Sequence, residues 1–197
     1  MKKLLLTCVL LSCLTSCSYV PETISVKYQP TKEVLPIATA EKVRLGVQVF
    51  DNRRHSTKVG FKKGDGYVEM AAIRLDGSLP DVISKGLETE LKNRGFKIDS
   101  EENRQAMIEV EIQKFFNDFK KGFFTDRGVA EIIFSVHVKK GNGDIVYSKT
   151  IMGLGERDGL WMHSGSNCRA ALEEALTDAM HKLLDDQAFI QALTKKV

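Results

Sequence analysis

Three successive segments of alternating apolar and polar residues constrain the fold of this chain most strongly. Apolar side chains occupy every second position in residues 106–113 and 130–138, and a Gly-Asn-Gly-Asp turn at 141–144 leads into a third segment at 145–155. Because successive side chains of a strand point to opposite faces of a sheet, each segment predicts a strand with one buried face. Their close spacing along the chain predicts an antiparallel meander.

Other segments predict further strands and the helices that cover them. Residues 43–49 alternate like a strand, and residues 58–74 have the pattern of a hairpin. Apolar stripes at helical spacing predict two main helices at 79–94 and 167–185, with a short helix at 186–194. The sequence therefore predicts an α+β fold: a mostly antiparallel sheet of about five to six strands, with two main helices packed on one face.

The start of the chain has the features of a secretory leader and is too short for a lasting membrane span. Lys2 and Lys3 give it a positive beginning, and the apolar stretch that follows covers only residues 4–14. A helix of that length reaches about 16 Å, roughly half the hydrocarbon core of a bilayer. We therefore expect this segment to direct export and then to be removed.

The leader ends in a motif that resembles the lipobox of bacterial lipoproteins. Leu14, Thr15 and Ser16 supply an aliphatic residue and two small ones, and Cys17 follows them. In that class of protein the cysteine thiol receives a diacylglyceryl group, and the peptide is cut just before it. A rival box ends at Cys13, but it leaves a shorter apolar stretch. Cys17 is the expected lipid attachment site, and two or three acyl chains there would hold the protein on a membrane.

The lipobox divides the chain into three parts. Residues 1–16 are the expected signal peptide, residues 17–42 a lipidated N-terminus with a tether, and residues 43–197 a periplasmic α+β domain. Prolines interrupt the tether, although alternation around Ile24 is a weak pattern of an edge strand. In Gram-negative lipoproteins, a serine such as Ser18 after the lipidated cysteine is compatible with transfer to the outer membrane. The expected location is therefore the periplasmic face of that membrane.

Composition argues against several classes of partner and cofactor. The chain has 29 Lys and Arg against 26 Asp and Glu, an excess too small to indicate a nucleic-acid binder. Once the leader is removed and Cys17 is modified, only Cys168 remains, so no internal disulfide is expected. Cys168 falls on the apolar stripe of a helix, where a buried and inert thiol is usual. The four histidines show no metal-ligand spacing, so we predict no metal or other cofactor and expect each histidine in a surface or loop position.

Several segments together resemble the YajG-like family of bacterial outer-membrane lipoproteins. They are the lipobox, a Gly-Val-x-Val strand at 46–49, a helix end Lys-Asn-Arg-Gly-Phe at 92–96, and an Ala-Leu-Thr-Asp-Ala-Met pattern at 175–180. The resemblance covers nearly the whole mature chain and implies an outer-membrane lipoprotein that faces the periplasm. That family has no assigned activity, so the resemblance implies no active site.

Aromatic and basic residues are the candidate contacts with a partner. Residues 115–124 form an expected loop group with five phenylalanines, more than one face of a strand can bury, and Phe116 and Phe123 are the candidates there. Trp161, the only tryptophan, lies in a glycine-rich loop before the last long helix and is the preferred binding anchor. Arg53 and Arg54 belong to a basic segment that could meet lipid headgroups or an acidic partner, or could simply protect a hairpin edge.

Three kinds of function are compatible with these features. The first is a non-enzymatic lipoprotein that contacts an envelope protein as an interaction, scaffold, secretion or assembly factor. A pocket lined by Phe and Trp would favour the second, a module that binds a lipid or a peptidoglycan fragment. A Ser or Asp hydrogen-bonded to His137 or His163 within such a pocket would favour the third, a hydrolase. No catalytic sequence motif occurs, so the first function is preferred and no catalytic residue is predicted.

Overall fold

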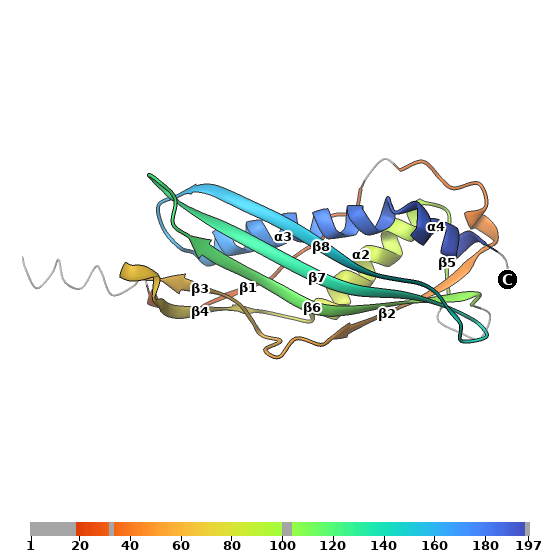
Figure 1. Ribbon diagram of the computed structural model, residues 1–197, viewed down its shortest axis with the longest axis horizontal. Coiled ribbons are helices and arrows are strands. Elements are labelled where there is room, and N and C mark those ends of the chain that lie inside the picture. The colour runs from red at the N-terminus through yellow and green to blue at the C-terminus, as the bar shows by residue number, and fades with distance from the viewer. Residues whose placement is uncertain (1–18, 32–33, 100–103, 196–197) are drawn as a thin grey trace, which may run out of the picture.

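Three long strands form the middle of the fold and run along most of its length (Figure 1). The computed structural model describes residues 19–31, 34–99 and 104–195. Two antiparallel hairpins join these strands, so the predicted meander is confirmed. The strands are β6 (Ala106–Lys120), β7 (Asp126–Lys140) and β8 (Ile145–Leu160).

β6 is longer than the alternating pattern predicts because a bulge interrupts it. The pairing register with β7 shifts just after Ile112, and the side chains that follow change face. Phe115 and Phe119 then point into the core, where they are fully buried. The expected loop of five phenylalanines is therefore mostly strand, and only Phe123 and Phe124 lie in the turn that follows β6.

The rest of the sheet is mixed, so the prediction of a mostly antiparallel sheet of five to six strands is wrong in both respects. β2 (Arg44–Asp51) and β3 (Lys58–Lys63) run parallel to β6, one after the other along its edge. β4 (Glu69–Leu75) forms the predicted hairpin with β3, while β1 (Glu22–Ile24) and β5 (Lys97–Ile98) pair in parallel with β4 and β2. The described residues thus form an eight-stranded sheet, whose shortest strands are too short to show alternation. Two 3-10 helices complete this part, η2 (Ala40–Lys42) and η3 (Asp65–Tyr67).

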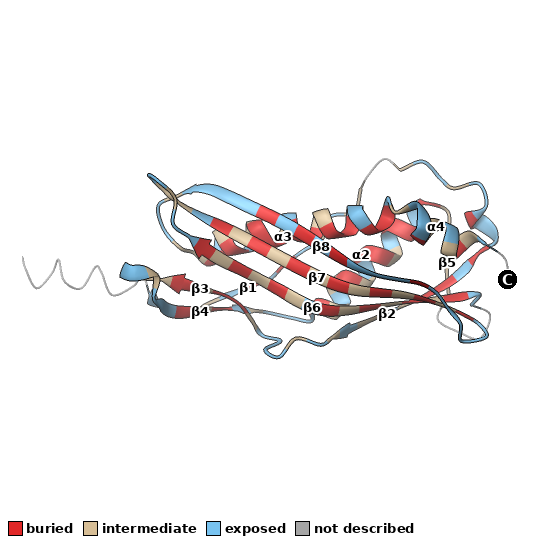
Figure 2. Ribbon diagram, in the orientation of Figure 1, coloured by how far each residue is buried: buried red, intermediate tan, exposed pale blue. Residues whose placement is uncertain are grey.

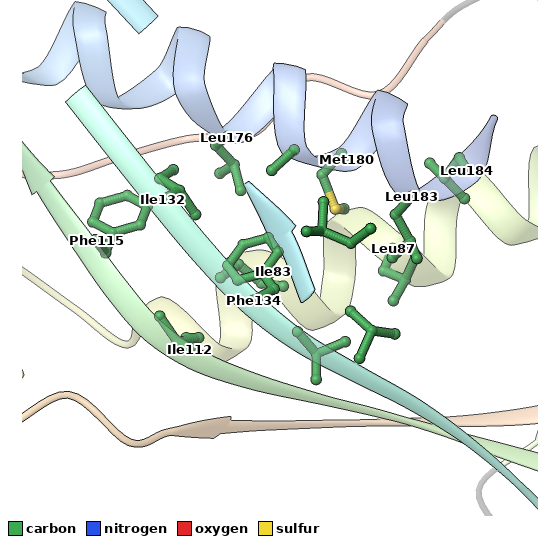
Figure 3. Packing of buried hydrophobic residues seen from close by; sticks show 14 of the residues in the cluster. Ile83, Leu87, Ile112, Phe115, Ile132, Phe134, Leu176, Met180, Leu183 and Leu184 are labelled. Atoms are coloured by element: carbon green, nitrogen blue, oxygen red, sulfur yellow. The ribbon is translucent and has the colours of Figure 1, made fainter. Parts of the chain in front are cut away.

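The described residues contain three α-helices, which pack against one face of the sheet as predicted. α2 (Leu79–Asn93) and α3 (Gly165–Leu184) are the two main helices, and α4 (Gln187–Thr194) is the short one. Ser78 and Ser164 cap the two long helices by accepting N–H hydrogen bonds from their first turns. None of these helices is long and apolar enough to cross a membrane. Figure 3 shows side chains from both main helices meeting those of the sheet: Ile83, Leu87, Ile112, Phe134, Leu176 and Met180.

Burial alternates along the meander because only one face of the sheet is covered. Figure 2 shows buried and half-buried residues following one another along β6 and β7. The side chains on the uncovered face are mixed in character, with acids and lysines beside Phe116, Ile133 and Leu154. The core therefore lies in one layer between the sheet and the helices.

Two glycines of β8 determine how closely α3 approaches the sheet. A Cβ atom at Gly153 would collide with the carbonyl oxygen of Ala175, and one at Gly155 with that of Ala171. Because these positions lack a side chain, the backbone of α3 rests directly on the strand.

Side chains of α3 also close the free edge of β8. The Asp178 carboxylate accepts a hydrogen bond from the backbone N–H of Leu154 at 2.8 Å. The Lys182 ammonium donates to the carbonyl oxygen of Met152 at 3.0 Å and pairs with Asp178 at 2.7 Å. These contacts occupy backbone groups that another strand would need for pairing.

The segment before β2 is fastened to α2 through one buried carboxylate. Glu90 accepts hydrogen bonds from the Tyr28 hydroxyl and from the backbone N–H of Thr31, both at 2.7 Å, and pairs with Arg94 at 2.5 Å. Burial raises the pKa of the Glu90 carboxyl, but these hydrogen bonds outweigh burial and hold the pKa below its usual value. An edge strand does occur here, but β1 covers Glu22–Ile24, and the alternating residues that follow Ile24 are not part of a strand. The chain therefore packs on the domain from β1 to Thr31.

Candidate functional site

One end of the sheet brings four separate segments together around a cleft. The described chain begins there at Tyr19, beside η3, the β6–β7 turn and the loop from β8 to α3 (Figure 1). We call this the Tyr19 end. The cleft has a volume of about 590 Å³ and is lined by charged and aromatic side chains, among them Lys63, Tyr67, Asp126, Trp161 and His163.

His163 lies under the cleft with both ring nitrogens occupied. Its Nε2 atom is 2.8 Å from a carboxylate oxygen of Asp126, and its Nδ1 atom is 3.1 Å from the backbone nitrogen of Lys63 and 3.0 Å from the carbonyl oxygen of Lys63. The ring stacks on Phe119 with the centroids 4.3 Å apart. His163 lies in a loop, as expected, but this loop folds inward and leaves the side chain only 9% exposed.

Asp126 joins this histidine to the turn between β3 and β4. Its carboxylate accepts hydrogen bonds from His163 and from the Tyr67 hydroxyl. Burial raises the pKa of the Asp126 carboxyl, but these hydrogen bonds outweigh burial and hold the pKa below its usual value. Burial, and then the hydrogen bond to Asp126, raise the pKa of the Tyr67 hydroxyl to about 12. Tyr67 has a φ of 61°, which is costly for a residue with a side chain, so its bond to Asp126 helps to hold a strained turn.

Acids from neighbouring segments neutralise the two lysines of β3 that line the cleft. The Lys63 ammonium lies 2.5 Å from the Asp118 carboxylate. Lys62 pairs with Glu22 of β1, and Glu22 also accepts a hydrogen bond from the backbone N–H of Gly165 at 2.6 Å. Because Gly165 begins α3, the partial positive charge of the helix end stabilises this carboxylate. These ion pairs and the Glu22–Gly165 hydrogen bond therefore tie β3 to β6, to β1 and to the start of α3.

The His163–Asp126 pair lacks the surroundings of a catalytic dyad. A general base needs a nitrogen within hydrogen-bond reach of a nucleophile, whereas both nitrogens of His163 contact other groups of the protein. The adjacent hydroxyl of Ser164 accepts a hydrogen bond from Asn167 at 3.3 Å and caps α3. Across the described ranges, no group of His, Cys, Asp or Glu side chains is arranged to hold a metal ion. An aspartate hydrogen-bonded to His163 in a cleft with an aromatic lining is the arrangement expected to favour a hydrolase, and Asp126 forms it beside Trp161. The pair brings no nucleophile to a free nitrogen of His163, however, so it fastens loops.

Four of the exposed large apolar side chains at the Tyr19 end come from two loops, the β6–β7 turn and the loop after β8. In the β6–β7 turn, Phe123 is 93% exposed and Phe124 is 86% exposed, and their rings meet edge to face with centroids 4.6 Å apart. In the loop after β8, Trp161 is 87% exposed and Met162 is 66% exposed. We call these four residues the aromatic tip. The fold thus brings two of the predicted contacts, Phe123 and Trp161, to the same end of the molecule.

The other predicted contacts lie elsewhere. Phe116 is half-buried on the uncovered face of the sheet, where its ring packs against a neighbouring aromatic ring. The Arg53 guanidinium is bound internally at 2.8 Å from the Asp51 carboxylate, and its side chain is 6% exposed. Arg54 is exposed in the same loop. Cys17, the predicted lipid attachment site, lies outside the described residues.

Cys168 is buried beneath the start of α3, as its place on the apolar stripe predicts. The residue has no exposed surface, and its thiol faces the carbonyl oxygen of Val59 at 3.8 Å. Burial raises the pKa of the thiol to about 12. The thiol is therefore protonated and inert at neutral pH.

An acid bonded to His163 was one of the arrangements considered from the sequence, but the sequence does not indicate that the acid is Asp126 or that Tyr67 joins the group. These residues come from three segments far apart in the chain, and no spacing rule links them. The one local signal is that His163 follows Trp161 by two residues in a loop, which does not show whether the ring turns inward. Only the tertiary fold places the three side chains together.

Comparisons with known proteins identify the family and support the fold. A family model described as "Uncharacterized lipoprotein" matches residues 31–194. A search of curated proteins gives no significant match. The crystal structure of a protein from Xanthomonas campestris is similar, with 16% identity and a TM-score of 0.58, over 87% of this chain and 95% of that chain. A second crystal structure, of an uncharacterized protein, shows 13% identity and a TM-score of 0.52, over 83% and 99% of the two chains.

Named lipoproteins also occur among the similar structures. A minor lipoprotein from Acinetobacter baumannii is 9% identical, with a TM-score of 0.46, over 82% of this chain and 99% of that chain. At such identities, likeness to solved structures concerns the fold alone. The family match is the firmer result because it covers the chain from η2 through α4. The chain therefore belongs to this family of uncharacterized lipoproteins.

Proposed function

We propose that this protein is a non-enzymatic lipoprotein, anchored by a lipid on Cys17 to the periplasmic face of the outer membrane, that acts by contact with another envelope protein. The observation that carries the proposal is the family match to lipoproteins, taken with a lipobox that ends two residues before the described chain begins. A lipid at that position would hold the described domain at the surface of the membrane.

Different observations support the outer-membrane location and the non-enzymatic action by protein contact. Ser18 after the lipobox and the resemblance to the YajG-like family both favour the outer membrane. The hydrogen bonds that occupy both nitrogens of His163 favour a structural role for the group below the cleft. Among the candidate partner contacts, Phe123, Trp161 and Arg54 are exposed, and Phe116 is half-buried.

The cleft supports a second candidate function, the binding of a lipid or peptidoglycan fragment. The expected lining of Phe and Trp is met in part: Trp161 and Tyr67 line the cleft with Lys63 and Asp126, and no phenylalanine is among its described lining residues. The cleft thus offers both aromatic and polar contacts. Adding a soluble peptidoglycan fragment or a short-chain phospholipid should then change the fluorescence of Trp161 in a saturable way. A fluorescence signal that neither compound changes would contradict this second function.

The lipid anchor is tested by replacing the lipobox cysteine in the native host. Cys17→Ser should abolish lipidation and leave the leader uncut, because the modified thiol is lost. Cys13→Ser is the matched control, since it removes the rival cysteine and should leave lipidation unchanged. Intact-protein mass spectrometry and membrane fractionation give the readout. Loss of the lipid in Cys13→Ser, or an unmodified Cys17 in the natural protein, would contradict the proposed anchor.

The choice of membrane is tested by a second substitution. Ser18→Asp should move the lipidated protein from outer-membrane to inner-membrane fractions in a density gradient, following the sorting rule of Gram-negative lipoproteins. Ser18→Thr is the control that keeps a small hydroxyl residue. A natural protein already in the inner-membrane fraction would contradict the outer-membrane location and leave the lipid anchor intact.

A further inference from the structure

We infer that the aromatic tip inserts into the bilayer interface, so that the protein contacts the membrane through side chains of its fold as well as through the lipid. This inference rests on the proposed anchor at Cys17 and adds a second membrane contact to it. The two contacts are separable, because the lipid sits on the start of the chain and the tip is formed by Phe123, Phe124, Trp161 and Met162.

The tip side chains lack the packing that apolar residues of this size normally find. Phe123 and Phe124 touch each other, yet each is at least 86% exposed. Trp161 is 87% exposed one residue after the end of β8. Neighbouring exposed apolar groups on separate loops mark a surface that is covered in use, because water solvates them poorly.

The start of the chain places this surface next to the proposed anchor. Tyr19 and Trp161 line the same cleft, and the Tyr19 hydroxyl lies close to Gly64 in the β3–β4 turn. Only Ser18 separates Cys17 from Tyr19 in the sequence, and two residues of extended chain span at most about 7 Å. A diacylglyceryl group on Cys17 would therefore hold the Tyr19 end at the lipid surface.

The residue types of the tip and the lysines beside it suit a lipid interface. Tryptophan and phenylalanine bury apolar area at the headgroup boundary, and the indole N–H can still find a polar partner there. Lys120 and Lys121 precede the two phenylalanines and are exposed, so they can meet lipid phosphates. We therefore assign the lipid bilayer as the occupant of this surface.

The hydrogen-bonded group of Tyr67, Asp126 and His163 holds the two loops of the aromatic tip side by side. Asp126 follows Phe124 by two residues, and His163 follows Trp161 by two residues. The 2.8 Å contact between Asp126 and His163 therefore ties the aromatic turn to the tryptophan loop. Because this contact lies inside the protein, the tip can enter the interface without disrupting the fold.

Trp161 provides the test because it is the only tryptophan of the chain. The lipidated protein is reconstituted into phosphatidylcholine vesicles, with and without lipids that carry bromine on their acyl chains. Bromine quenches tryptophan only at short range, so we expect strong quenching of Trp161 and a blue-shifted emission. An emission maximum typical of water, with no quenching by brominated lipid, would overturn the inference.

A double variant and a matched control establish which side chains insert. Phe123→Ser with Phe124→Ser removes two exposed rings outside the core, so the unlipidated double variant should bind vesicles at least about tenfold more weakly, as measured by Trp161 quenching at limiting lipid. Leu35→Ser is the control, because Leu35 is 89% exposed and lies near η2, away from the tip. Equal quenching in the double variant and the control would overturn the role of the phenylalanines.

The outcomes separate this inference from the anchor. Vesicles that retain the protein without quenching Trp161 would overturn tip insertion and leave the anchor standing. If mass spectrometry shows no lipid on Cys17, the proposed anchor fails, and excess vesicles added to the unlipidated protein still decide about the tip. Quenching of Trp161 under those conditions would support insertion of the tip, and an absence of quenching would overturn it.

Discussion

The two turns of the central meander differ in a way that the fold does not require. The β7–β8 turn at 141–144 is polar: the Asn142 side chain accepts a hydrogen bond from the Asp144 N–H at 3.1 Å, and Gly143 adopts a φ of 91°. The β6–β7 turn at 121–125 instead exposes Phe123 and Phe124. The two turns lie at opposite ends of β7 and both contain glycine, yet only the β6–β7 turn places two large apolar side chains in solvent.

This difference between the turns separates residues that backbone geometry requires from residues that need a functional explanation. The glycine and asparagine of the polar turn are explained by backbone geometry alone. The two phenylalanines contribute nothing to the core and expose apolar area to water, so their presence needs another reason. The difference therefore supports the proposal that the aromatic tip at the Tyr19 end has a functional role.

The largest expected effect comes from removing the side chain that ties the Tyr19 end together. His163→Ala deletes a buried ring, removes one of the hydrogen-bond partners of the Asp126 carboxylate and leaves the backbone of Lys63 without its contact to the ring, so we expect a loss of roughly 2–4 kcal/mol in the free energy of unfolding. Urea denaturation followed by circular dichroism measures it. His55→Ala, in an exposed loop, is the control and should change stability by less than about 0.5 kcal/mol. Similar losses of stability in both variants would show that the hydrogen bonds of His163 contribute no more to the free energy of unfolding than an exposed loop residue does.

A smaller effect on the free energy of unfolding is expected from Asp126, a member of the same hydrogen-bonded group, and this effect should depend on pH. The native pKa of Asp126 lies below its unfolded value, so its contribution is fully present above about pH 4 and is lost as pH falls through the native pKa. Asp126→Asn should therefore be less stable than the natural protein at pH 7, and the difference should shrink below pH 4. A difference that grows on acidification would show that the sign is wrong.

The polar turn should be sensitive to backbone geometry. Gly143→Ala places a side chain at positive φ and should cost about 1 kcal/mol of stability in urea denaturation. Gly141→Ala is the matched control, because Gly141 does not have positive φ and its nearest neighbour for an added Cβ is 3.9 Å away. An equal cost at both positions would remove the geometric explanation of this turn.

The aromatic turn should be the least sensitive. Phe123→Asn with Phe124→Gly gives it the residue types of the polar turn and should change the free energy of unfolding by less than about 0.5 kcal/mol, because neither ring is packed in the core. A loss of more than about 2 kcal/mol would mean that the phenylalanines serve the fold, and the contrast between the turns would disappear.

The sequence predicts the parts of this fold that depend on local pattern. Alternation identified the meander, and apolar stripes at helical spacing identified α2 and α3. Pairing direction could not be predicted, because the alternation of β2 is the same whether its neighbour is parallel or antiparallel. β5, with two residues, is too short to show any alternation.

The residues of the candidate site likewise divide into those that the sequence identifies and those that it does not. Trp161 was identifiable as the only tryptophan, in a glycine-rich loop, and Phe123 because the phenylalanines of residues 115–124 exceed what one face of a strand can bury. The contact between His163 and Asp126 was not, because it joins segments whose proximity exists only in the folded sheet. The structure also shows that Arg53 is held internally by Asp51, which no charge pattern indicates.

The most direct test measures which end of the meander faces the bilayer. β7 has 15 residues, so the two turns are separated by about 50 Å. A fluorophore is attached to an introduced cysteine, either Lys121→Cys or Asn142→Cys, in the lipidated protein; Cys168 is buried, and its high thiol pKa prevents labelling. Energy transfer to an acceptor in the bilayer should be strong from position 121 and weak from position 142. Equal transfer from both positions, or stronger transfer from position 142, would contradict the claim that the aromatic end lies on the membrane.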